Sequence, residues 1–207
     1  MRRFVIVLLG GLFTLALCTC ANPRMTGGLT DASVAELDQR MHGVLNKYFD
    51  PAIVPSLKQI RVNYIRNLHA PFTGEKVDGY YNPLTNSLTL DPMIGESSTV
   101  HEFVHVAWFQ HLSLWTTLRF RMVMTSVAAD PKHKAFTTRV RTGLDRNHWL
   151  NNLFARTTET YSDISEIMIK EEAPESVPDE VKAFYRGVLK ERPSPDHEEQ
   201  EAPPDSQ

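Results

Sequence analysis

Cysteine is almost absent from this chain of 207 residues, because its only two cysteines, Cys18 and Cys20, lie near the N-terminus. The body of the protein therefore has no disulfide framework and no cysteine-based zinc finger. An excess of charge of one sign is also missing, since 22 Lys and Arg residues balance 25 Asp and Glu residues, for a net charge of −3. This balance argues against a protein that wraps nucleic acid, which would carry a basic excess.

The composition is otherwise that of a globular protein, with 42% hydrophobic and 23% charged residues. It excludes a wholly disordered chain, a collagen and a multi-span membrane protein. We expect one domain at residues 31–190, preceded by a short linker at 22–30 that contains Pro23 and two glycines. The residues from 191 to 207 are rich in proline and acids and have no large apolar side chain, which predicts a disordered acidic tail.

The first 21 residues have the layout of an export signal. Arg2 and Arg3 precede an apolar run from Phe4 to about Ala16, and small residues follow. A leucine lies three positions before Cys20 and another three before Cys18, as before the lipid-modified cysteine of a bacterial lipoprotein signal. A cleaved signal, membrane attachment through a lipidated Cys20 or Cys18, and an uncleaved anchor all remain open. Each of them predicts an exported body, in the periplasm or cell envelope or secreted.

The hydrophobic pattern predicts an α+β fold, with short strands in the first half of the domain and helices after them. Thr30 or Asp31 is expected to cap the first helix, and Ser97 or Ser98 the helix that begins near Thr99. The region 130–146 is a polar segment without an assigned element. The expected elements are helices at 31–48, from 99 onward to about 129, at 147–171 and at 178–190, and strands at 60–64, 80–81 and 87–90.

Residues 101–105 are His-Glu-Phe-Val-His, the pattern H-E-x-x-H, within a predicted helix. Four residues turn a helix by about 400°, so His101 and His105 project about 40° apart on one face. Two imidazoles placed in this way can take adjacent corners of a tetrahedral Zn²⁺ site. Glu102 lies next to that face, where its carboxylate can accept a proton from water on the metal. The motif therefore predicts a catalytic zinc site with Glu102 as the general base.

A catalytic zinc ion needs a third protein ligand, and two residues compete for this role. His111 would complete the three-histidine spacing of the metzincins. In a continuous helix, however, His111 points about 240° away from His105, and Trp108 stands where the metzincins have glycine. Glu159 is the other candidate, in the segment Thr-Glu-Thr-Tyr-Ser-Asp at 158–163.

The E-x-x-x-D pattern of Glu159 and Asp163, taken with H-E-x-x-H, resembles the gluzincin metallopeptidases, the broad group that includes thermolysin-like enzymes. The resemblance implies a zincin-like fold, with a small antiparallel or mixed sheet packed on the active-site helix. It also implies Glu159 as the third zinc ligand and Asp163 as the carboxylate that orients a ligand histidine. Because the two acids are four residues apart, they project from one helix face. The alternative is that Glu159, Asp163 and Glu166 form the solvated face of an amphipathic helix.

The strand, turn and strand from Gly79 to Asp91 extend the resemblance. Gluzincin-like peptidases have a strand edge along the cleft, and this edge pairs with an extended substrate backbone. The residues that could polarise a substrate carbonyl are Tyr80, Tyr81, His148 and Arg156.

The leading functional hypothesis is an exported zinc-dependent metallopeptidase that hydrolyses peptide bonds of a peptide or protein substrate. A second hypothesis is a non-catalytic cell-envelope protein with a structural or vestigial zinc site. A third is a metal-dependent hydrolase that acts on a non-peptide amide or ester. A structural site has no need for a general base and closes its fourth position, so Glu102 favours the catalytic hypotheses.

Overall fold

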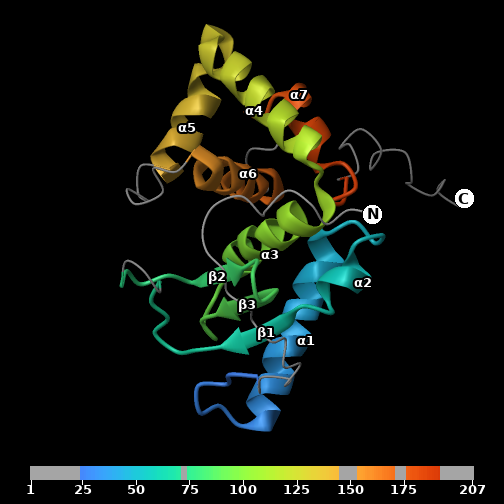
Figure 1. Ribbon diagram of the computed structural model, residues 1–207, viewed down its shortest axis with the longest axis vertical. Coiled ribbons are helices and arrows are strands. Elements are labelled where there is room, and N and C mark those ends of the chain that lie inside the picture. Colours follow the sequence, from blue (N-terminus) through green and yellow to red (C-terminus); the bar gives the residue numbers. More distant parts are fainter. Residues whose placement is uncertain (1–23, 71–73, 145–152, 171–175, 192–207) are drawn as a thin grey trace, which may run out of the picture.

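A computed structural model of the chain describes residues 24–70, 74–144, 153–170 and 176–191. The predicted export signal, His148 and the tail after residue 191 lie outside these ranges. Within them, no helix is both long enough and apolar enough to cross a bilayer. Figure 1 shows helices above and below a central helix, α3 (Glu96–His111), with a small sheet on its lower side.

The sheet has three strands in the order β1-β3-β2, where β1 is Arg61–Tyr64, β2 is Gly79–Asn82 and β3 is Ser87–Leu90. β1 pairs with β3 in parallel, and β2 pairs with β3 antiparallel. β2 therefore lies at an edge of the sheet. Side chains alternate between the two faces of a strand, so Leu88 and Leu90 share one face with Gly79 and Tyr81. That face packs on α3, which confirms the predicted α+β class with a small mixed sheet.

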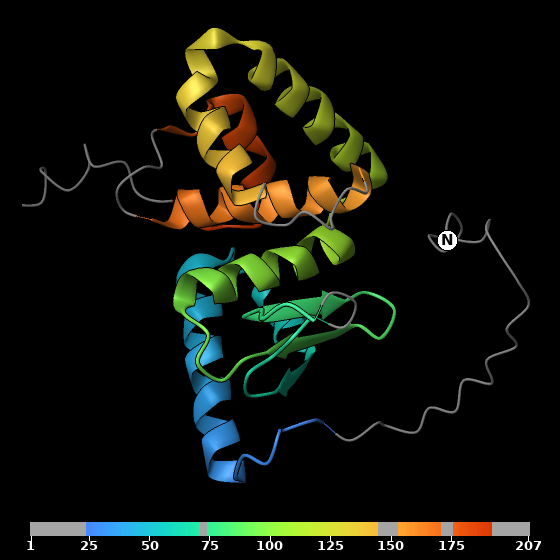
Figure 2. The same cartoon turned by 90° about the vertical axis from the view of Figure 1, so that its left-hand side faces the viewer.

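Helix α3 lies between the sheet and helix α6 (Leu153–Ile169), as Figure 2 shows. Helix α1 (Asp31–Tyr48) also packs against α3, and the short α2 (Val54–Leu57) joins it. From Thr99 to Trp108 every residue of α3 is buried except His101, which is half-buried. A helix covered on all sides belongs in the interior of a fold. Its functional side chains therefore sit between two layers rather than on an open surface.

A cluster of aromatic rings joins α6 to α3, to α4 (Leu114–Ala129) and to the 3₁₀ turn η3 (Ala183–Tyr185). The remaining described elements are α5 (Lys134–Leu144), α7 (Asp179–Lys182) and the 3₁₀ turn η1 (Pro131–His133). Tyr161 of α6 stacks on Tyr185 with ring centroids 4.3 Å apart and contacts Trp108 of α3 at 4.8 Å. Phe120 of α4 packs edge-on against both Trp108 and Tyr161. The Tyr161 hydroxyl donates a hydrogen bond to the Phe184 carbonyl at 2.7 Å. This aromatic cluster fixes α6 against α3.

Several elements follow the sequence pattern closely. α1 spans the predicted residues, and the Thr30 side chain accepts a hydrogen bond from the backbone N–H of Ser33, as a cap does. The strands around 60–64 and 80–90 are also confirmed. In the predicted helix at 147–171, the described part begins at Leu153.

Three predictions about the elements were wrong. α3 begins at Glu96 after Gly95, so Ser97 and Ser98 lie inside its first turn and do not cap it. The polar segment at 130–146 contains η1 and α5, because Phe136 and Val140 supply a buried stripe between charged residues. The last helix does not run from 178 to 190, since α7 and η3 end by Tyr185 and Gly187 follows with a positive φ of 74°.

We expect Tyr161→Phe to lower the free energy of unfolding by about 1–2 kcal/mol. The ring contacts remain, but the Phe184 carbonyl loses its donor in a partly buried position. Tyr48→Phe makes the same chemical change at the surface, where the hydroxyl contacts Glu96, and should cost less than about 0.5 kcal/mol. Urea denaturation of the two variants measures the difference. Equal losses would show that the Tyr161 hydroxyl does not hold α6.

Candidate metal centre

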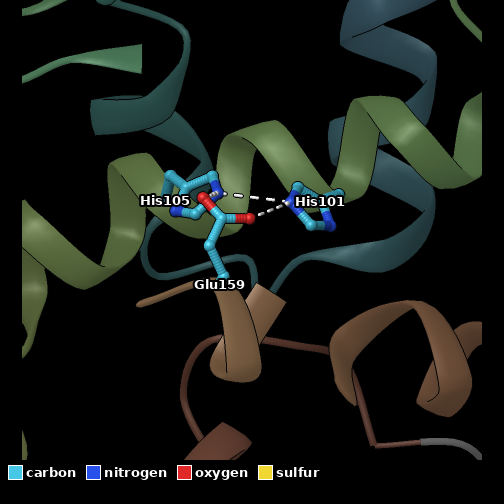
Figure 3. A group of neighbouring side chains, drawn as sticks. All are labelled: His101, His105 and Glu159. Atoms are coloured by element: carbon cyan, nitrogen blue, oxygen red, sulfur yellow. Dashed lines mark hydrogen bonds and ion pairs between the residues drawn. The ribbon is translucent and has the colours of Figure 1, made fainter. Parts of the chain in front are cut away.

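Three side chains converge where α3 faces α6. The Nε2 atoms of His101 and His105 lie 3.2 Å apart on one face of α3. Glu159, from α6, places its Oε2 atom 3.3 Å from His101 Nε2 and its Oε1 atom 3.3 Å from His105 Nε2. Figure 3 shows the carboxylate reaching up from α6 between the two imidazoles. The four-residue spacing of the histidines and the packing of α6 thus bring the three predicted ligands together.

The spacing of these donor atoms suits a zinc ion. Zn–N and Zn–O bonds of about 2.0–2.2 Å in a tetrahedron separate neighbouring ligand atoms by roughly 3.3–3.5 Å. The 3.2 Å between the two Nε2 atoms, and the 3.3 Å from each Nε2 to one or the other Glu159 oxygen, are close to that value. The ligand atoms of the three residues lie within 4.8 Å of one another, and two imidazoles with one carboxylate form a donor set that zinc uses in catalytic sites. The residues present therefore fit a zinc ion.

The charges at the centre favour a bound cation. Burial raises the pKa of Glu159, but the nearby His105 and the contact with His101 outweigh it and hold the pKa well below its usual range. Burial likewise lowers the pKa of His101, while the carboxylates of Glu159 and Glu166 outweigh this effect and raise it. Glu159 is consequently ionised at neutral pH, which is the form that binds a metal ion.

Glu102 is a buried carboxylate next to the two histidines. Its side chain is pressed against the start of β2, because a Cβ atom at Gly79 would lie only 2.7 Å from the Cγ atom of Glu102. Burial raises the pKa of Glu102, and the two histidines oppose this effect. Its Oε2 atom is buried and has no hydrogen-bond partner. A buried carboxylate oxygen without a partner is costly, so the position needs a functional explanation.

The other ring nitrogen of His101 faces two further acids of α6. His101 Nδ1 lies 3.0 Å from Glu166 Oε1 and 3.5 Å from Asp163 Oδ1. Both contacts are ion pairs, and Nδ1 makes no hydrogen bond with either acid. Contact with His101 brings the pKa of Glu166 to about 2 against the effect of burial, whereas burial raises the pKa of Asp163 to about 6. Glu166 is thus the closer and more fully ionised carboxylate.

Ser97 and Ser98, in the first turn of α3, form hydrogen bonds to the two elements on either side of the centre. The Ser97 hydroxyl donates to Glu166 Oε2 at 3.0 Å, which ties α3 to α6. The Ser98 hydroxyl donates to Asp78 Oδ2 at 3.0 Å, directly before β2. Both serines lie in the first turn of α3, which begins at Glu96, and their side chains contact neighbouring elements instead of capping the helix.

The remaining predicted residues lie elsewhere. His111 Nε2 is hydrogen-bonded to Ser56 at the end of α3, so the structure does not bring His111 to the other histidines. The Tyr81 hydroxyl donates to Asn86, and the Tyr81 ring packs on Phe109. Tyr80 points to the face of β2 opposite α3, because it alternates with Gly79. His148 and the side chain of Arg156 lie outside the described residues.

Glu166 and Gly79 are the site residues that the sequence reasoning missed. Glu159, Asp163 and Glu166 are not a solvated face, because their side chains are only 18%, 20% and 26% exposed. The 159, 163 and 166 spacing of three acids along one helix was the available signal for Glu166. For Gly79 the sequence carried no signal, since its role depends on which residue of α3 it meets.

No protein-family model, no curated protein and no solved structure matches this chain. The geometry of the site is therefore the basis for its functional assignment.

We expect Gly79→Ala to lower the free energy of unfolding by about 1–3 kcal/mol, because the added methyl group overlaps Glu102 and forces one of the two to move. Gly43→Ala is the matched control. Gly43 lies within α1 with open space around it, so alanine there should raise stability by about 0.5–1 kcal/mol. Urea denaturation separates the two signs. Stabilisation by Gly79→Ala would contradict the close packing of β2 on Glu102.

Glu166→Gln should weaken Zn²⁺ binding by about 10–100-fold, as is typical when a ligand histidine loses its orienting carboxylate. Asp163→Asn should have a smaller effect, because its oxygen lies farther from His101 Nδ1. Titration of each variant with zinc against a chelating indicator measures both affinities. A larger loss in Asp163→Asn would assign the orienting role to Asp163.

Proposed function

We propose that this chain is a zinc-dependent metallopeptidase of the gluzincin type, with a zincin-like arrangement of its α+β fold. The observation that carries the proposal is the convergence of His101, His105 and Glu159 at tetrahedral spacing beside the buried carboxylate of Glu102. The order of these residues along the chain and their positions on two packed helices both agree with the gluzincin pattern.

In this proposal His101, His105 and Glu159 hold the metal ion, and Glu166 with Asp163 orients His101. A zinc ion bound there would polarise the scissile carbonyl and lower the pKa of water so that hydroxide forms near neutral pH. The first of the two helices supplies both histidines and the base, and the second supplies only carboxylates. The reaction therefore depends on the two helices keeping their relative position.

Glu102 moves the proton. Its carboxylate takes a proton from the attacking water and passes it to the nitrogen of the leaving amine. Burial raises the pKa of Glu102. A carboxylate with a raised pKa takes the proton from water more readily and holds it until the leaving nitrogen accepts it. Its unpartnered Oε2 atom is the group that would receive this proton.

The edge strand β2 is suited to hold an extended peptide. The Asp91 N–H donates to the Asp78 carbonyl, and the strands pair Gly79 with Leu90 and Tyr80 with Thr89. Because bonded and non-bonded pairs alternate in an antiparallel ladder, the backbone N–H and C=O groups of Gly79 and Tyr81 point away from β3. A substrate strand added there would run past Glu102, which packs under Gly79.

A structural zinc site is the competing interpretation of the same residues. Structural sites usually have four protein ligands around the ion. Among the described residues, the cluster around both Nε2 atoms consists of three residues, which leaves a position for water or substrate. The buried Glu102 also favours catalysis. Export, and lipid attachment at Cys20 or Cys18, remain predictions from the first 21 residues.

Substitutions at the centre should affect zinc binding and peptide hydrolysis separately. Glu102→Gln keeps the shape of the side chain and should retain one zinc ion per chain, while peptide hydrolysis falls by about 10²–10⁴-fold. Glu159→Gln removes an anionic ligand, so zinc affinity itself should fall. His111→Ala should change neither quantity, since His111 contacts Ser56. Elemental analysis of untagged protein and a quenched-peptide assay measure the two properties.

The outcomes separate the alternatives. Folded protein that cannot be loaded with zinc would exclude a metal centre. Retained zinc with unchanged hydrolysis in Glu102→Gln would exclude the proposed base. Stable zinc binding without hydrolysis of any peptide library would favour the structural site or a non-peptide substrate. Zinc lost in His111→Ala but kept in Glu159→Gln would favour the metzincin alternative.

A further inference from the structure

Helix α4 has an apolar face on each side. Phe120 and Val127 are buried on the side that packs into the core. On the opposite side lie four large apolar side chains that are 39% to 80% exposed: Leu114, Trp115, Leu118 and Met122, here called the α4 stripe. At about 100° per residue, these four positions fall within an arc of about 100°. The α4 stripe is thus one continuous apolar strip that faces solvent.

Arginines border the α4 stripe on both sides. By the same helical geometry, Arg121 lies about 20° beyond one margin of the stripe and Arg119 about 40° beyond the other. α4 contains no acidic residue. Between residues 114 and 144 the one acid is Asp130, which is paired with Lys132. The basic residues of this stretch are Arg119, Arg121, Lys132, Lys134, Arg139 and Arg141.

This basic stretch has six Lys and Arg residues and one acid, whereas the rest of the chain has 16 Lys and Arg residues and 24 acids. Figures 1 and 2 show α4 and α5 meeting at the end of the molecule that lies farthest from the sheet. The α4 stripe occupies the N-terminal part of α4, which follows directly on α3, and Figure 2 shows α4 along an outer edge of the molecule. The stripe, its arginine borders and its position together describe a helix that lies in the plane of an interface.

We propose that the α4 stripe docks on the surface of an anionic lipid membrane. Trp115, Leu118 and Met122 enter the boundary between headgroups and acyl chains, where tryptophan is enriched. Arg119 and Arg121 remain at headgroup level on the two sides and pair with lipid phosphates. This contact is independent of the metal centre, because none of the stripe residues belongs to it.

A second copy of the chain fits the α4 stripe less well. In a symmetric dimer centred on α4, each subunit would present the same face to the other. The arginine borders would then lie against arginine borders, with no acid of α4 to pair with them. An anionic surface complements the same borders. Charge therefore favours a membrane over self-association.

The test follows the fluorescence of Trp115 in the full chain, because bromine quenches this ring only if α4 itself reaches the bilayer, whichever other segment attaches the protein. The protein is mixed with vesicles of brominated phosphatidylcholine and phosphatidylglycerol, and the difference between wild-type and Trp115→Phe isolates Trp115 from the other two tryptophans. We expect bromine to quench Trp115 in these vesicles and not in brominated phosphatidylcholine alone. Arg119→Gln with Arg121→Gln should weaken the vesicle affinity of α4 by about 10–30-fold at low salt.

A matched apolar pair provides the control. Met122→Ser should reduce the quenching of Trp115, whereas Met93→Ser should not, although Met93 is 87% exposed. Circular dichroism checks that each variant is folded. Absence of quenching in the anionic vesicles, equal quenching in neutral vesicles, or insensitivity to Met122→Ser would overturn the proposal. A dimer in solution that Met122→Ser dissociates, without quenching by lipid, would assign the stripe to a second copy.

Discussion

The packing of α6 on α3 is the constraint on which the candidate centre depends. His101 and His105 come from one helix and Glu159 from the other, so the three donor atoms meet only while the two helices keep their spacing. In this contact, two histidines face three partly buried acids. The three carboxylates would repel one another without a positive charge between them. Protonated histidine or a divalent cation can supply that charge, and the observed donor spacing suits zinc.

Apolar packing carries the energy that holds these charged groups in place. Tyr161 lies two residues from Glu159 and two from Asp163, and it stacks on Tyr185 and touches Trp108. The acids of α6 therefore project from a helix whose other side is fixed by aromatic rings. Buried ionic groups contribute little net stability because their desolvation is expensive. The aromatic cluster therefore supplies stability that the buried charges of the candidate centre do not.

In the proposed mechanism, one side of α3 binds the metal ion and the other side positions the base beside the edge strand. Towards α6, the histidines meet carboxylates that can hold and orient a metal ion. Towards the sheet, Glu102 packs under Gly79 at the edge strand, where a peptide could be added. Ser97 and Ser98 tie the same turn of α3 to both neighbours. A shift of α6 would move Glu159 away from the histidines, and a shift of the sheet would move the edge strand away from Glu102.

The sequence by itself determined the elements and the candidate ligands that depend on local spacing. The H-E-x-x-H pattern placed two histidines on one helix face, and E-x-x-x-D placed Glu159 on the face of another helix, because helical periodicity is a local property. α1 and the strands at 79–90 followed from alternation and capping for the same reason.

Only the tertiary structure decided which groups meet across elements. It showed that α3 begins at Glu96, so Ser97 and Ser98 do not cap the helix but form hydrogen bonds to neighbouring elements. It also showed that Glu166 lies closer to His101 than Asp163 does. It also showed that Gly79 lies on Glu102, and that one face of α4 is left exposed. These contacts join residues 20 to 69 positions apart, and their geometry depends on how the layers pack. No local pattern of residues encodes that packing.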